Sequence, residues 1–293
     1  MKKVPFYQID VFTDIPLGGN PLALFPEVPG WSDEVLLKIA REMNLSETVF
    51  LFPPEDSSAH FKMRIFTPEK EIPFAGHPVI GTSFAIFEKR WLGREIKELV
   101  LKLPIGLISV ALKEDGISCM QQPQPQFLDI FEDIDLLADS LGIDSEDITP
   151  SSPAQVVSTG FPCLFVPLNS LNAMKRLKVN SEPFARVLQQ ASVDMIYAFS
   201  QETELVKSTV HSRSFAPLIG IPEDPATGSA AGALGAYLLS HGIIAGGKIL
   251  IEQGYEINRP SCIFVEVSKK STSEWKIEVG GKSVFILEGQ IGV

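Results

Sequence analysis

Two stretches of the sequence carry no charged residue and are apolar on every side of a helix. The first is residues 78–87, PVIGTSFAIF, and the second is residues 230–239, AAGALGAYLL. A helix with an amphipathic stripe lies on a surface, whereas a helix that is apolar all round must be buried. The sequence therefore predicts two buried helices, and each of them needs a sheet or barrel to surround it.

The two predicted helices follow similar loops, which indicates that the chain is built from two similar halves. Phe66 and Pro68 precede Gly76, and Phe215 precedes Gly228 in the same way, although the spacing is ten residues in one case and thirteen in the other. A chain of 293 residues also exceeds what one hydrophobic core usually supports. Two domains are the main prediction, and one very large core is the alternative.

The remaining pattern predicts an α+β fold in which a mixed sheet or barrel wraps around a central helix in each half. An amphipathic helix is expected around residues 35–43, and the acidic segment 129–147 is patterned as a surface helix plus a loop. The first domain is expected to cover residues 1–116 and to be completed by the strand 284–293, and the second to cover 117–283, related by an approximate twofold axis. Strands are predicted at residues 4–12, 22–25, 47–52, 60–66, 207–215, 261–268, 275–279 and 283–287.

Composition excludes several classes of function. A net charge of −11, from 36 acidic against 25 basic residues, repels nucleic acid and anionic lipid. The longest uncharged stretch is interrupted by glycines, so no membrane span is expected. The N-terminus lacks the continuous apolar core of a signal peptide. The three cysteines are widely spaced, with no metal-ligand spacing, so they are interpreted as reduced thiols of a cytoplasmic protein.

The start of each buried helix is a candidate binding site for an anion. Main-chain N–H groups near Gly76 and Gly228 are left unpaired at a helix N-terminus, where the helix dipole is positive. If the two termini face each other, they form a cradle for a substrate carboxylate, to which Ser229 adds a hydroxyl group. The same glycines also fit an alternative in which they only permit close helix packing.

Three side chains are candidates for moving a proton. His77 lies at the first turn of a buried helix, where the dipole lowers the imidazole pKa, but a capping or core histidine fits equally well; the other three histidines lack a comparable setting. Asp224 precedes the second buried helix, where an acidic residue most often caps backbone donors. Glu47 begins a strand on the same face as Val49 and Leu51, and a carboxyl group among apolar side chains has a raised pKa. A solvated glutamate is the alternative for Glu47.

These segments together resemble the PhzF-like family of phenazine-biosynthesis isomerases, which are relatives of diaminopimelate epimerase. The matching blocks cover the chain from end to end and stand in the family's order: FTDIPLGGNPLALF, NLSETVF, FTPEKEIPFAGHPVIGTSF, FAPLIGIPEDPATGSAAGALGAYL and EQGYEINRPS. The resemblance implies two domains, each with a mixed sheet around a central helix, and an active site between them. The sequence departs from the family at Ile257 and Asn258, where Met-Gly is usual, and this affects the expected substrate choice.

The resemblance also implies the chemistry. Glu47 is similar to the family's general acid/base, His77 and Asp224 to its partners, and Ser229 to a substrate contact. The reaction in the best-known member is a proton shift on dihydro-hydroxyanthranilate, without a metal or an organic cofactor. A homodimer is expected from the resemblance and from the frequency of twofold dimers.

Two other functions fit parts of the sequence. An epimerase of the same fold needs two opposed thiols, and the three cysteines lie outside the segments around Gly76 and Gly228. A protein that binds a small acid without converting it needs the cradle alone. A candidate acid/base and a candidate relay favour the isomerase.

Overall fold

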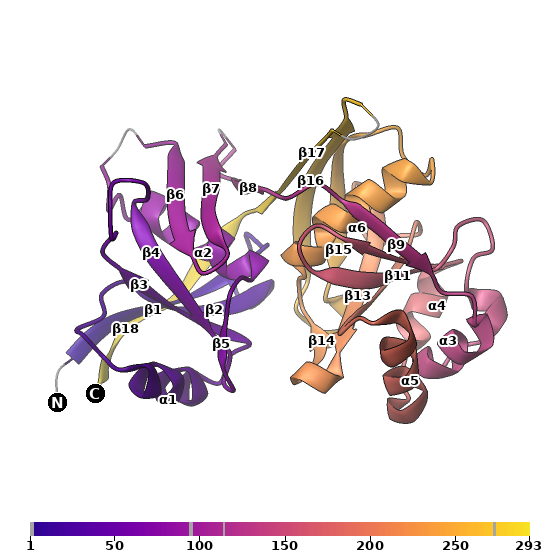
Figure 1. Ribbon diagram of the computed structural model, residues 1–293, viewed down its shortest axis with the longest axis horizontal. Coiled ribbons are helices and arrows are strands. Elements are labelled where there is room, and N and C mark those ends of the chain that lie inside the picture. Colours follow the sequence, from indigo (N-terminus) through magenta and orange to yellow (C-terminus); the bar gives the residue numbers. More distant parts are fainter. Residues whose placement is uncertain (1–2, 94–95, 114, 272–273) are drawn as a thin grey trace. The chain divides into compact units, whose positions relative to one another are not determined.

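The computed structural model of the protein describes residues 3–93, 96–113, 115–271 and 274–293 (Figure 1). The chain packs into two compact units, one formed by residues 1–121 with 280–293 and the other by residues 122–279. No helix within the described ranges is long and apolar enough to cross a membrane.

The described residues of the first unit form a mixed sheet and the helices α1 and α2. The strands are hydrogen-bonded in the order β18-β1-β2-β3-β4-β6-β7-β8, parallel between β2 and β3 and between β4 and β6, and otherwise antiparallel. The short β5 forms a hairpin with β4. The elements are β1 (Lys3–Val11), β2 (Asn20–Phe25), α1 (Asp33–Met43), β3 (Glu47–Phe52), β4 (Phe61–Phe66), β5 (Glu71–Ile72), α2 (Gly76–Glu88), β6 (Glu98–Leu103), β7 (Gly106–Leu112), β8 (Ser118–Gln121) and β18 (Ser283–Gly292).

The second unit repeats this plan with more helices. The order is β9-β10-β11-β12-β13-β15-β16, and β14 forms a hairpin with β13. The elements are β9 (Gln126–Ile130), α3 (Ile134–Leu141), η1 (Ser145–Asp147), β10 (Gln155–Ser158), β11 (Pro162–Leu168), α4 (Leu171–Arg176), α5 (Ser181–Ala191), β12 (Ile196–Ser200), β13 (Val210–Ala216), η2 (Pro217–Ile219), β14 (Ile221–Asp224), α6 (Gly228–Ser240), β15 (Gly247–Gln253), η3 (Tyr255–Ile257), β16 (Ser261–Lys269) and β17 (Trp275–Gly281).

The succession of strand pairings is the same in both units. Two antiparallel pairs are followed by a parallel, an antiparallel, a parallel and an antiparallel pair, and the buried helix follows the short hairpin strand each time. Helices α2 and α6 have 13 residues each and are buried along most of their length among the strands of their own unit (Figure 1). The predicted α+β fold, with a mixed sheet around one buried helix in each half, is confirmed.

Several local predictions need correction. Both buried helices begin two residues before the predicted ranges, so that Gly76 and Gly228 are their first residues. The acidic segment 129–147 opens with the end of strand β9, and only then continues as helix α3, whose apolar face is buried. Four of the five β9 side chains are exposed. This strand therefore lacks the alternation of apolar and polar residues by which a half-buried strand is predicted.

Gly81 shows how closely α2 packs on its sheet. A Cβ atom at this position would lie 2.6 Å from Cγ2 of Val11 and 2.9 Å from Cδ2 of Leu22. Alanine normally stabilises a helix relative to glycine by about 1 kcal/mol. Here we expect Gly81→Ala to destabilise the protein by about 1 to 3 kcal/mol, because the added methyl group overpacks the core. Urea unfolding monitored by circular dichroism checks the sign, and a variant as stable as the parent would contradict the packing.

Candidate active site

Glu47 is buried on the face of the sheet that carries α2. It is the first residue of β3 and pairs with Leu22 of the parallel strand β2. Phe50 packs in the core beneath α1, so alternation along the strand directs Glu47, Val49 and Leu51 to the opposite face. The residue is 7% exposed, which excludes the solvated glutamate that the sequence also allowed. The predicted face of the strand is confirmed.

His77 lies beside Glu47. It is the second residue of α2, is 5% exposed, and places Nε2 3.4 Å from Oε2 of Glu47. Within the part of the chain that the structure describes, Nε2 makes no hydrogen bond. Burial lowers the pKa of His77 to about 3, so the imidazole is neutral at pH 7 and the contact is not an ion pair. The sequence predicted a lowered pKa from the helix dipole, whereas the main cause here is loss of hydration.

Asp224 ends strand β14 in the second unit, opposite Ser214 of β13. Its side chain is 8% exposed, and its Oδ2 accepts a hydrogen bond of 2.6 Å from the hydroxyl group of Thr227. Thr227 occupies the N-cap position of α6. The first two residues of this helix are Gly228, which is buried, and Ser229, which is half-buried.

The N-termini of α2 and α6 have the properties of anion-binding sites. Among the residues that the structure describes, neither N-cap residue, Ala75 of α2 or Thr227 of α6, makes a side-chain capping hydrogen bond. Each helix therefore presents first-turn N–H groups at the positive end of its dipole, beside His77 in the first unit and Ser229 in the second. A carboxylate is the kind of ligand that such a terminus favours.

Each unit brings together its own predicted residues. Glu47, Gly76 and His77 gather in the first unit, and Asp224, Gly228 and Ser229 gather in the second. The catalytic and binding roles that the sequence suggested for these six residues stay predictions.

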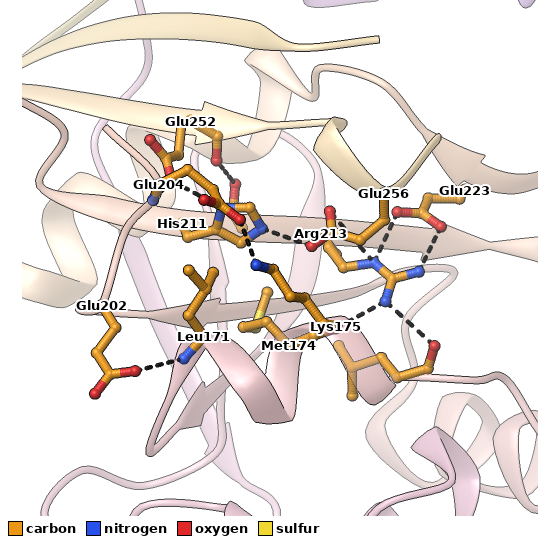
Figure 2. A network of polar contacts seen from close by, with 12 residues as sticks. Leu171, Met174, Lys175, Glu202, Glu204, His211, Arg213, Glu223, Glu252 and Glu256 are labelled. Carbon is orange, nitrogen blue, oxygen red and sulfur yellow. Dashed lines mark hydrogen bonds and ion pairs between the residues drawn. The ribbon is translucent and has the colours of Figure 1, made fainter. Parts of the chain in front are cut away.

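A buried polar network in the second unit includes Glu223, the residue before Asp224, and the sequence did not predict it (Figure 2). His211 of β13 is fully buried; its Nδ1 lies 2.8 Å from Glu252 and its Nε2 lies 3.0 Å from Glu256. Carboxylates accept hydrogen bonds, so both ring nitrogens donate and the imidazole is charged. Burial alone would lower the pKa of His211, but these two hydrogen bonds outweigh it and raise the pKa to about 9.

Arg213, two residues further along β13, extends the network to the residue before Asp224. Its guanidinium group donates two hydrogen bonds of 2.8 Å to Glu223 and two more to the main-chain oxygens of Met174 and Leu177. The signal for this network is the run His211-Ser212-Arg213-Ser214, which is polar and yet buried throughout. Polar residues on both faces of a strand between apolar neighbours indicate buried partners.

The turn that departs from the expected motif contains a residue with a left-handed backbone conformation. Asn258 follows η3 with φ of 57°, in the left-handed region. Glycine adopts this conformation most readily, and asparagine is among the side chains that tolerate it best. Asn258 thus adopts the left-handed conformation that glycine favours, and Ile257 is the other residue that differs from the expected motif.

Comparison with known proteins identifies the family. A family model described as phenazine biosynthesis-like protein (PhzC-PhzF) matches residues 9–289. The chain belongs to this family. The trans-2,3-dihydro-3-hydroxyanthranilate isomerase of Pseudomonas aeruginosa is 37% identical over 293 residues, which cover 97% of this chain and 98% of that protein. The PhzF family resemblance predicted from the sequence is confirmed.

Solved structures agree with this assignment. A PhzF family protein of Bacillus anthracis superposes with a TM-score of 0.92 at 30% identity, over 100% of both chains. A hydroxyproline epimerase of Agrobacterium vitis, at 12% identity and a TM-score of 0.63 over 99% of this chain and 92% of the other, shares the fold. The chain is thus an isomerase of the PhzF family.

Proposed function

We propose that this PhzF family isomerase shifts a proton from one carbon to another on a small carboxylic acid, with Glu47 as the general acid/base. The buried Glu47 carboxyl group beside a neutral His77 is the observation that carries the proposal. A general base must be held away from bulk water if the proton it takes is to return to the substrate. Glu47 has this setting.

His77 and Asp224 are proposed as the assisting groups. The neutral imidazole of His77 can accept a proton at one ring nitrogen and donate from the other, so it can exchange a proton with Glu47 without carrying a charge at rest. Asp224 accepts a hydrogen bond from Thr227 at the start of α6. A carboxylate there can orient a polar group of the substrate.

The helix N-termini are proposed as donor sites for anionic groups of the substrate. The donor in the first unit is the N–H group of Gly76, and the donors in the second unit are the N–H group of Gly228 and the hydroxyl group of Ser229. As the C–H bond breaks, negative charge spreads into the conjugated acid, and fixed donors stabilise that charge without reorganising. A second C–H bond then forms elsewhere, so the reaction is neither an oxidation nor a reduction and requires no co-reactant.

The proposed substrate class is supported by the Pseudomonas aeruginosa relative, which is named as a trans-2,3-dihydro-3-hydroxyanthranilate isomerase. We propose a cyclic amino carboxylic acid of this kind. The half-buried Ile257 replaces the usual methionine on the η3 turn, and a β-branched side chain is stiffer than methionine. A change of substrate preference is expected at this position.

The test is conversion of a panel of cyclic and amino carboxylic acids that includes trans-2,3-dihydro-3-hydroxyanthranilate, followed by NMR and mass spectrometry in H2O and in D2O. We expect a product of unchanged composition in H2O. The fraction of product that gains one deuterium in D2O measures how often the proton held by Glu47 exchanges with solvent before it is returned to the substrate. Enzyme treated with EDTA is expected to keep its activity, since every proposed step belongs to a side chain or a helix N-terminus. Binding of these acids without conversion would contradict the proposal.

A further inference from the structure

Gln253 is a buried residue that contacts the Asp224 loop at three points. It is the last residue of β15 and is fully buried. Its Nε2 lies 2.7 Å from the main-chain oxygen of Asp224 and 3.0 Å from Oγ1 of Thr227. Its Oε1 lies 3.1 Å from the main-chain nitrogen of Thr227 and 2.9 Å from the hydroxyl group of Tyr197. A single side chain thus connects β12, β15 and the start of α6.

The main-chain partners fix the orientation of this amide. A carbonyl oxygen can only accept a hydrogen bond, so the atom facing Asp224 O must be the amide nitrogen. The N–H group of Thr227 can only donate, so the atom facing it must be the amide oxygen. If the amide were flipped, its oxygen would face the main-chain oxygen of Asp224, so that two acceptors would meet. Its nitrogen would face the N–H group of Thr227, so that two donors would meet. The amide therefore has one orientation.

The Thr227 hydroxyl group is hydrogen-bonded to both Gln253 and Asp224. Its Oγ1 accepts a hydrogen bond from Nε2 of Gln253. The hydroxyl group donates its own hydrogen to Oδ2 of Asp224 at 2.6 Å, which is the arrangement that an ionised carboxylate accepts. A hydrogen bond to the charged form of a carboxyl group favours ionisation. The chain of donors runs from Gln253 through Thr227 to Asp224.

We propose that Gln253 is a positioning residue that commits the Thr227 hydroxyl hydrogen to Asp224 and so holds Asp224 in its ionised form. The proposal rests on the proposed function, in which Asp224 assists the proton shift. Gln253 itself does not touch the reacting atoms. It acts through Thr227, and it also fixes the main-chain oxygen of the aspartate that it serves.

Other titratable groups stand on the elements around Asp224 in the second unit. None of them is altered in the variants below, so their charges are common to every comparison. They are Tyr197 of β12, His211 and Arg213 of β13, Glu223 of β14, Glu252 of β15, Glu256 of η3 and Arg259, which follows it.

The experiment measures the ionisation of Asp224 directly. Protein labelled with 13C at the aspartate carboxyl carbons is titrated by NMR, and the Asp224 signal is assigned by its loss in Asp224→Asn. We expect Gln253→Met to raise the titration midpoint of Asp224 by up to about one pH unit, because the freed hydroxyl group can turn to other acceptors. Thr227→Val is expected to raise the midpoint as well, and Thr227→Ser to restore it.

The double variant separates positioning from a structural effect. With Thr227→Val already present, Gln253→Met is expected to cause no further shift, because no hydroxyl hydrogen remains to be directed. An equal shift in both backgrounds, or no shift in either, would overturn the proposal. If Gln253→Met does not fold, Gln253→Glu replaces it. The charge that glutamate adds is the same in the parent protein and in Thr227→Val, so it does not affect the comparison between them.

A matched control and an activity measurement complete the design. Gln124 makes a similar pair of amide hydrogen bonds, to the main chain of Trp275, and Gln124→Met is expected to leave the midpoint unchanged. In each variant, the acid limb of the plot of kcat against pH should shift in the same direction as the Asp224 titration midpoint measured by NMR. If Asp224→Asn keeps full turnover while the NMR cycle behaves as expected, the proposed role of Asp224 fails and the role of Gln253 stands.

Discussion

Glu47→Gln is expected to lower kcat by about two to four orders of magnitude, which corresponds to roughly 3 to 5 kcal/mol of transition-state stabilisation. Glutamine has the size of glutamate and keeps most of its hydrogen bonding, but it cannot take a proton from carbon. Because Glu47 is buried at the start of β3, a neutral isostere should disturb packing little. Folding and substrate binding should therefore survive while turnover is lost.

The control for Glu47→Gln is Glu98→Gln. Glu98 is also the first residue of a strand, β6 of the same unit, but it is exposed. This variant should retain full activity. If Glu47→Gln converts the substrate at a near-normal rate, Glu47 is a structural residue and the proposed mechanism is wrong.

Variants of the assisting groups rank the roles within the mechanism. His77→Ala and Asp224→Asn should reduce kcat less than Glu47→Gln if they assist, and as much if they carry the proton themselves. A loss in kcat/KM without a loss in kcat would instead assign the residue to uniform substrate binding.

The two buried helices could be predicted from the sequence because their signal is local. A helix of ten residues that is uncharged and apolar on every side is expected to be buried, and both α2 and α6 are. The position of Glu47 on the same strand face as Val49 and Leu51 followed from simple alternation. Its proximity to His77 did not, because β3 and α2 are separated in sequence and the contact depends on how the helix lies on the sheet.

The polar residues around Asp224 could not be predicted for a different reason. Gln253 and Thr227 are 26 residues apart, and His211 and Glu252 are 41 apart. Both contacts depend on strand β15 ending beside β13, with which it pairs in parallel. Parallel pairing requires a long connection, and periodicity within one strand carries no information about its partner.

His211 gives the largest expected effect on stability. Folding raises its pKa to about 9, so its contribution to the free energy of unfolding is fully present below the unfolded value of about 6.5 and is lost as pH rises through 9. The shift corresponds to a contribution on the order of 3 kcal/mol. Burial alone would raise the pKa values of Glu252 and Glu256, but hydrogen bonds from His211 lower both. Their contribution is present above about pH 4.5 and is lost in acid.

His211→Gln should therefore be most destabilising between about pH 5 and 6.5, where the charged histidine and both carboxylates are all in their favourable forms. We expect a loss of about 3 to 5 kcal/mol there, because two buried carboxylates lose the cation that compensates them. Near pH 10 the parent has lost that cation too, so the difference between the two proteins should shrink to about 1 kcal/mol. Urea unfolding curves recorded across this range give both values.

His241→Gln is the control, since His241 is half-buried and burial lowers its pKa. This variant should lose little free energy of unfolding at any of these pH values. A His211→Gln protein whose deficit stays constant from pH 6 to pH 10 would show that the imidazole is neutral in the folded protein, and the two carboxylates would then need another source of compensating charge.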